Sequence, residues 1–310
     1  MRRRDFIKGI TVLTTWPVAA RAQQTSKTHR IALVHPSASI ADMNESGGNQ
    51  NYVALFGELR RLGYIEGVNL VVARYSGEGR EEHFVELCQE IARTKPDVIV
   101  ASSSRLALSC KAATATVPIV ATMADPIPSG IVVNIARPEV VPTASKVGFL
   151  GSHQIWSQPP LNELRKAAQQ LGISLLGPPM ETPFEVEEYR RVLAKMAQER
   201  VDGVIIGDQP EHSSYKQFIV DLVRAAKLPA VFPYSEDSLI GALIAYGSSS
   251  PALYRRLATY IDQILKGAHP ADLPIYLTSK FDLTINLRTA KALGLNIPPS
   301  LLVRADEVIE

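Results

Sequence analysis

Three consecutive serines, Ser102 to Ser104, stand between an apolar segment and a predicted helix. A serine at such a position caps the helix, because its side-chain oxygen accepts a hydrogen bond from a free backbone N–H group. The N–H groups that remain free at a helix N-terminus favour an anion such as a carboxylate. Two interpretations are therefore open for Ser103 and Ser104: capping alone, or capping together with binding of an anionic group.

A second set of side chains carries negative charge. Asp208 and Gln209 follow another apolar segment at the same relative position as the serines, where an acidic group favours an ammonium group or hydroxyls. Asp125 lies in a further loop that follows a predicted strand, and Glu236 and Asp237 lie in another. A solvent-exposed turn residue is the alternative interpretation for each of these acids.

Aromatic side chains near the same loops could contact an apolar or aromatic ligand. Tyr234 and Tyr246 are the main candidates and Trp156 is a third, although each of these rings could equally pack inside the fold. The candidate ligand-binding residues are Ser37, Ser103, Ser104, Asp125, Asp208, Gln209, Tyr234 and Tyr246.

Signals for catalysis are weak. Gly77 and Gly79 follow a predicted strand, but Glu82 occupies the third glycine position of a dinucleotide-binding fingerprint. The sequence has neither a Gly-x-Ser-x-Gly nucleophile elbow nor a P-loop. The six histidines are scattered, and His35 and His212 fall in strand-end loops, where each contacts a ligand or is an ordinary surface residue. We therefore expect a protein that is not an enzyme and that has no catalytic residues, no metal and no cofactor.

Short β-rich segments alternate with helical patterns, which is typical of α/β proteins with parallel sheets covered by helices on both faces. The predicted strands are Arg30–Val34, Leu70–Tyr75, Val98–Ala101, Ile119–Thr122, Lys146–Leu150, Ile173–Leu176, Gly203–Gly207, Ala230–Phe232, Leu243–Tyr246 and Phe281–Asn286. The predicted helices are Tyr52–Leu62, Glu81–Thr94, Ser104–Ala115, Pro160–Leu171, Phe184–Gln198, His212–Ala226 and Pro251–Lys266.

A weak internal repeat divides the chain into two similar halves. One half runs from Asp97-Val98-Ile99-Val100 through the serine loop and a helix to Val117-Pro118-Ile119-Val120. The other runs from Asp202-Gly203-Val204-Ile205 through an acidic loop and a helix to Leu228-Pro229-Ala230-Val231. The repeat indicates two Rossmann-like lobes, with chance similarity between two βαβ units as the alternative. Ligands of open parallel sheets bind beyond the carboxyl ends of the strands, so two such edges that face each other make a cleft.

The first 22 residues predict an export signal. Basic residues precede an apolar stretch from residue 9 to residue 20, and Ala20-Arg21-Ala22 supplies the small residues for cleavage after Ala22. The segment from Arg3 to Lys8 resembles the twin-arginine export motif. An amphipathic helix of the mature fold is the alternative, which Trp16-Pro17 disfavours. The stretch is too short to span a bilayer, so we expect a periplasmic protein with no stable membrane insertion of the mature chain.

Removal of this segment reverses the sign of the net charge. The full chain has 33 basic and 31 acidic residues; without the segment 28 and 30 remain, and the net charge of +2 becomes −2. No Lys/Arg cluster remains elsewhere, which argues against nucleic acid as a partner. Export also implies an oxidising compartment, but Cys88 and Cys110 lie on predicted helices, and we favour two buried free thiols over a disulfide.

Several segments share a family pattern in their order and spacing. Besides the export segment they are Leu62-Gly63-Tyr64-Ile65-Glu66-Gly67, Ala124-Asp125-Pro126, Asp208-Gln209-Pro210, Ala245-Tyr246-Gly247 and residues 286–295. Together they resemble the tryptophan/tyrosine-type substrate-binding proteins of bacterial ABC transporters. The resemblance implies a two-lobed type I periplasmic binding protein whose chain crosses between the lobes three times and holds a small solute at the hinge side. By position it also implies solute contacts from Ser103, Asp125, Asp208, Gln209 and Tyr234.

One segment departs from that family pattern. Only residues 139–145 separate Pro138 from Lys146, which is too short for the crossing strand and helix that the family has there. We therefore expect a shortened first crossing that exposes an apolar edge and weakens the hinge. The expected lobes are residues 28–138 with 247–273, and residues 139–246 with 274–310.

The sequence thus predicts the periplasmic solute-binding component of an ABC transporter, which captures an amino-acid-like or aromatic small molecule. Its partners are then a permease and an ATPase subunit, and the bound solute shifts the lobes toward a closed form that the permease recognises. A periplasmic ligand-sensing module for a membrane signalling partner is the alternative.

Overall fold

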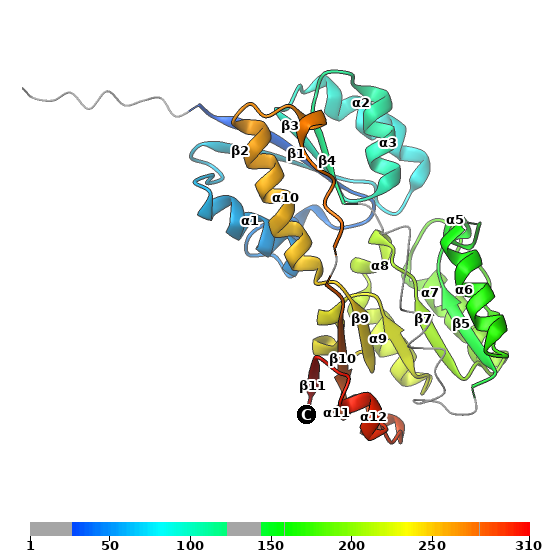
Figure 1. Ribbon diagram of the computed structural model, residues 1–310. Coiled ribbons are helices and arrows are strands. Elements are labelled where there is room, and N and C mark those ends of the chain that lie inside the picture. The colour runs from blue at the N-terminus through cyan, green and yellow to red at the C-terminus, as the bar shows by residue number, and fades with distance from the viewer. Residues whose placement is uncertain (1–26, 123–143, 158, 279) are drawn as a thin grey trace, which may run out of the picture.

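The computed structural model describes residues 27–122, 144–157, 159–278 and 280–310. These residues form two sheets, each with helices on both faces, and Figure 1 shows them as two separate lobes. The predicted export signal, Asp125 and nearly all of the shortened first crossing lie outside the described residues.

The first lobe contains a parallel sheet with the order β2-β1-β3-β4. Its strands are β1 (His29–His35), β2 (Leu70–Ser76), β3 (Val98–Ala101) and β4 (Ile119–Ala121). Helices α1 (Gln50–Arg61) and α10 (Ser250–Leu265) pack on one face, and α2 (Phe84–Arg93) and α3 (Ser104–Ala113) pack on the other (Figure 1). Short 3-10 turns are η1 (Ile40–Asp42), η2 (Glu81–His83) and η4 (Pro270–Asp272).

Helix α10 completes the core of the first lobe although it comes from the far end of the sequence. Tyr254, Leu257 and Ile261 of α10 are buried in one cluster with Leu55 and Leu59 of α1. The chain therefore passes between the sheets three times: after β4, between the second sheet and α10, and between α10 and the second sheet again.

The second lobe contains a sheet with the order β11-β10-β9-β8-β7-β5-β6. Its strands are β5 (Lys146–Leu150), β6 (Ser174–Leu176), β7 (Gly203–Ile206), β8 (Ala230–Phe232), β9 (Ile244–Gly247), β10 (Asp282–Asn286) and β11 (Glu307–Ile309). Helices α7 (Val186–Gln198) and α9 (Lys216–Ala225) cover one face of this sheet. The other face carries α6 (Pro159–Gln170), α11 (Leu287–Leu293) and α12 (Pro299–Leu302). The remaining short helices are α5 (His153–Ser157), α8 (Pro210–Ser213) and the 3-10 helix η3 (Ser235–Ile240).

The predicted α/β class with parallel sheets in two lobes is confirmed, and each predicted strand lies within one residue of its observed ends. Several features differ from prediction, among them the short helices α5, α11 and α12, for which the sequence pattern gives no range. The pair β9 and β10 is antiparallel, because β10 enters the sheet from an interlobe crossing rather than from a βαβ unit. The helix predicted over His212–Ala226 is broken into α8 and α9, and the short strand β11 was not predicted.

The preference for two free thiols is wrong, because Cys88 of α2 and Cys110 of α3 form a disulfide. The two helices pack together on one face of the first sheet, and both cysteines are fully buried there. Two helices predicted separately do not reveal that packing, which explains why the pairing was not foreseen.

Replacing both Cys88 and Cys110 with serine should lower the free energy of unfolding by about 3 kcal/mol, because the crosslink restricts the unfolded chain. The sequence separation of the bridge is 22 residues. Urea unfolding of the oxidised wild type and of the double variant measures the difference. A reductant should lower the midpoint of the wild type and leave the variant unchanged; an equal response of both proteins would contradict the prediction.

Candidate functional site

The carboxyl-terminal edges of the two sheets meet through direct contacts between the lobes. A hydrogen bond of 3.1 Å joins the hydroxyls of Ser37, after β1, and Ser214, after α8. The Nε2 atom of His35 lies 3.3 Å from the hydroxyl of Ser213. We call the region between these edges the interlobe site; its walls are the loops that follow β1, β3, β7 and β8.

The serine loop forms the first-lobe wall of the interlobe site. The hydroxyl of Ser103 accepts a hydrogen bond of 3.1 Å from the Leu106 N–H group, which confirms that Ser103 caps α3. Ser102 is buried, and its hydroxyl receives a hydrogen bond of 3.1 Å from the phenol of Tyr254. Ser104, the first residue of α3, is exposed. Capping and packing thus account for Ser102 and Ser103, while an anion at this N-terminus remains a prediction.

Asp208 and Tyr234 come together in the second-lobe wall. The Tyr234 hydroxyl donates a hydrogen bond of 2.6 Å to Oδ1 of Asp208. Burial raises the pKa of Tyr234 well above its usual value, and the neighbouring Asp208 carboxylate raises it further. The Nζ atom of Lys216 lies 4.6 Å from the centroid of the Tyr234 ring. The ring and the carboxylate are therefore held in a fixed relation.

Gln209 supports the interlobe site within the second lobe. Its Oε1 atom accepts a hydrogen bond of 2.7 Å from the Ser152 N–H group, and its Nε2 atom donates one of 2.8 Å to the Ser152 hydroxyl. Gln209 is buried, so its amide links the loop after β7 to the loop after β5.

Tyr246 packs inside the second lobe, among buried residues that include Leu283 and Ile285. Its ring stacks on Phe281, with centroids 6.1 Å apart. It also lines a cavity of about 60 Å³ against the second sheet, together with Val231 and Leu283. Trp156 likewise packs against a neighbouring ring, that of Phe149. Both rings therefore pack against aromatic neighbours of the second lobe.

The two strand-end histidines are buried, so the surface interpretation of both is wrong. Nδ1 of His35 accepts hydrogen bonds from the N–H groups of Ser37, at 3.1 Å, and Ala38, at 2.8 Å. His35 therefore shapes the loop that presents Ser37. Nδ1 of His212 lies 3.0 Å from the hydroxyl of Tyr189. Burial lowers the pKa of His35 to about 3 and that of His212 to about 4, so both rings are neutral near pH 7.

Glu211 and Arg105 are site residues that the sequence interpretation missed. Glu211 is a buried carboxylate of α8, and burial raises its pKa. The charge of Arg105, at the start of α3 in the first lobe, acts on Glu211 in the opposite direction. Arg105 also forms an ion pair with Glu81 of its own lobe. A charged residue in the first turn of a helix gives no sequence signal for such a partner in another lobe.

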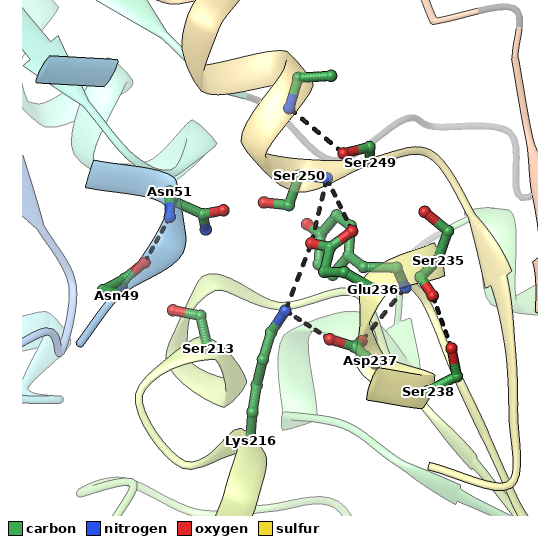
Figure 2. Close-up of polar contacts among 12 residues, drawn as sticks. Asn49, Asn51, Ser213, Lys216, Ser235, Glu236, Asp237, Ser238, Ser249 and Ser250 are labelled. Atoms are coloured by element: carbon green, nitrogen blue, oxygen red, sulfur yellow. Dashed lines mark hydrogen bonds and ion pairs between the residues drawn. The ribbon is translucent and has the colours of Figure 1, made fainter. Parts of the chain in front are cut away.

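A further charged group lies where the chain passes from β9 to α10. Figure 2 shows the Glu236 carboxylate between the N-terminus of α10 and the side chain of Lys216. Lys216 also donates a hydrogen bond of 2.7 Å to Oδ1 of Asp237. The sequence pattern places Glu236 and Asp237 in a strand-end loop but gives no signal for Lys216.

The described part of the chain contains no group of three or more side chains suited to hold a metal ion. Within the same residues, no helix is both long enough and apolar enough to cross a membrane.

The chain resembles solute-binding proteins in both sequence and fold. The profile of a family described as ABC transporter substrate binding protein matches residues 47–309, whereas no curated protein shows significant similarity. A conserved domain protein from Vibrio cholerae is 21% identical, with a TM-score of 0.77 and coverage of 91% of this chain and 100% of that one. An ABC domain from Streptococcus pneumoniae in complex with L-Trp is 19% identical, with a TM-score of 0.73 and the same coverage.

A third similar structure is an ABC transporter solute binding protein from Agrobacterium vitis with bound allitol. It is 15% identical, with a TM-score of 0.59 and coverage of 86% of this chain and 97% of that one. These likenesses show that the fold is that of type I periplasmic binding proteins, as the sequence predicts.

Proposed function

Because the chain belongs to the ABC transporter substrate-binding protein family, we propose that it captures an amino-acid-like or aromatic solute in the interlobe site and delivers it to a permease and its ATPase. The observation that carries the proposal is the opposite polarity of the two walls. The first-lobe wall presents the N-terminus of α3, and the second-lobe wall presents the Asp208 carboxylate.

Opposite polarity suits a zwitterion. A helix N-terminus attracts a carboxylate through its free N–H groups and the helix dipole. The Asp208 carboxylate attracts an ammonium group, and the ring of Tyr234 beside it offers a surface for an aromatic side chain. In this proposal Ser103, Ser104, Asp208 and Tyr234 contact the solute, Asp125 lies outside the described residues, and Ser37 and Gln209 hold the surrounding loops.

Solute capture depends on two lobes that separate and close. We keep the lobes at residues 28–138 with 247–273, and 139–246 with 274–310, and propose that a bound solute favours their closed arrangement. The Streptococcus pneumoniae structure holds L-Trp, which supports an amino-acid-like solute, whereas the Agrobacterium vitis structure holds allitol. A periplasmic location after cleavage behind Ala22 is part of the same proposal.

Mass spectrometry of the small molecules released from denatured purified protein tests the proposed function directly. A thermal-shift panel of L-amino acids and polyols follows, because a solute at one hundred times its Kd stabilises the folded state by about 2.7 kcal/mol. We expect an amino acid to give the largest shift. A polyol with the largest shift would contradict the solute class, and a protein that binds no small molecule would contradict the function.

A further inference from the structure

Three charged side chains of the second lobe lie together beside the β9-to-α10 crossing, and one of them contacts α10. We call Lys216, Glu236 and Asp237 the hinge cluster. Glu236 belongs to η3 of the second lobe, but its two carboxylate oxygens accept hydrogen bonds from the N–H group of Ser250 at 3.2 and 3.3 Å. Ser250 is the first residue of α10, which packs in the first lobe. One carboxylate therefore spans the hinge, and a negative charge is stabilised at the N-terminus of a helix.

The helix that carries Glu236 is fixed to the second sheet. Thr284 of β10 donates a hydrogen bond of 2.7 Å to the Ser235 carbonyl and accepts one of 2.8 Å from the Ser238 hydroxyl. The side-chain amide of Asn286 donates a third, of 2.9 Å, to the Ser238 carbonyl. Because η3 moves with the second sheet and Ser250 moves with α10, a change in the angle between the lobes changes the contact between Glu236 and Ser250.

Lys216 connects this contact to the interlobe site. Its Nζ atom lies 2.7 Å from Asp237, 3.9 Å from Glu236 and 4.6 Å from the centroid of the Tyr234 ring. Tyr234 in turn donates its hydrogen bond to Asp208. Asp237 is only 1% exposed, so a neighbouring cation is needed to compensate its charge. Contacts therefore run without a break from the N-terminus of α10, through one lysine, to the carboxylate of the interlobe site.

We propose that Lys216 is a positioning residue that couples the interlobe site to the angle between the lobes. The inference rests on the proposed function for what occupies the site, but the coupling itself is a property of the protein without solute. A displacement of Tyr234 or a change of charge at Asp208 alters the environment of the Lys216 ammonium. That ammonium compensates the charges of Asp237 and Glu236. A change in its environment therefore changes the strength of the hydrogen bonds between Glu236 and the N-terminus of α10.

Pulsed electron paramagnetic resonance on solute-free protein tests the coupling. Spin labels are placed on one exposed residue of each lobe, through Leu108→Cys in α3 and Glu163→Cys in α6, with the native disulfide kept oxidised. Lys216→Met keeps the length of the side chain and removes its charge. We expect it to broaden the distribution of interlobe distances about twofold. Lys195→Met is the matched control, because Lys195 forms an exposed pair with Glu199, and it should leave the distribution unchanged.

A double-mutant cycle separates coupling from local packing. Asp208→Asn changes the charge at the site and keeps an oxygen for Tyr234, so it should broaden the distribution in the presence of Lys216 and have little further effect in Lys216→Met. Additive effects, or a Lys216→Met distribution equal to that of the wild type, would overturn the proposal. If Lys216→Met does not fold, Glu236→Gln takes its place in the cycle, because it keeps an acceptor for Ser250 and removes the charge.

The two proposals fail in different ways. A wild type that binds no small molecule contradicts the proposed function, and the distance measurements need no solute. A wild type that binds an amino acid while the cycle is additive contradicts the coupling and leaves the proposed function intact.

Discussion

Replacing Asp208 with alanine is expected to weaken the binding of an amino-acid solute about a thousandfold, which corresponds to about 4 kcal/mol. The Asp208 carboxylate is half-buried and its position is fixed by the hydrogen bond from Tyr234. An ammonium group that enters the interlobe site loses its hydrating water. In Asp208→Ala no carboxylate stands at this position to replace the lost hydrogen bonds. Isothermal titration calorimetry measures the affinity for the amino acid that stabilises the wild type most.

Matched variants test the reason for this loss. Asp221 forms an exposed pair with Arg224 on α9, so Asp221→Ala removes the same side chain from the lobe surface and should leave affinity unchanged. Asp208→Asn keeps the acceptor for Tyr234 and should lose most of the affinity, because the charge is absent. If Asp208→Ala and Ser103→Ala both bind like the wild type, the assignment of the two walls is wrong.

Acidification from pH 7 to pH 5 is expected to lower the free energy of unfolding by about 2 kcal/mol for each of His35 and His212. Their pKa values in the folded protein are lowered to about 3 and about 4 by burial. The unfolded chain therefore binds more protons than the folded protein below about pH 6.5. This contribution to stability is complete above that pH and decreases as the pH falls toward the folded pKa values.

Asparagine variants isolate the histidine contribution. Neither His35→Asn nor His212→Asn titrates; the side-chain oxygen of the first can replace the Nδ1 acceptor of His35, and the side-chain amide of the second can bond the Tyr189 hydroxyl. Glu211, Glu236 and Asp237 have raised pKa values and change the stability in the opposite sense, but they are present in every variant. Urea unfolding at both pH values should show a dependence smaller by about 2 kcal/mol in each variant. An undiminished dependence would show that the histidines are not its source.

Local sequence patterns predict the strands because short apolar segments bounded by proline or glycine are too short for helices and are buried as strands of a sheet. Val98–Ala101, after Pro96, and Ala230–Phe232, after Pro229, have the observed ends. Strand β11 contains Glu307 and only two apolar residues, so its pairing with β10 depends on the rest of the sheet. Its local sequence carries too weak a pattern to predict it.

The polar contacts of the candidate site likewise include some that the local sequence predicts and others that it does not. A serine before a helix predicts its own cap, and Ser103 forms that cap within three residues of the chain. The partners of Gln209 and Lys216 lie across loops that only the folded sheet brings together: Ser152 is 57 residues from Gln209, and Asp237 is 21 residues from Lys216. Tyr246 is expected at the site because it is aromatic and near a strand end; in the fold its ring stacks on Phe281, a contact that the local sequence does not reveal.

The contribution of α10 to the first lobe also sets the order of events during synthesis. The strands β1 to β4 emerge from the ribosome long before Tyr254, Leu257 and Ile261, so one face of their sheet lacks its second helix until more than 260 residues are made. Contacts that join such distant parts of a chain form slowly, because a long loop must close first. The first lobe therefore reaches its native core only after most of the second lobe has been translated.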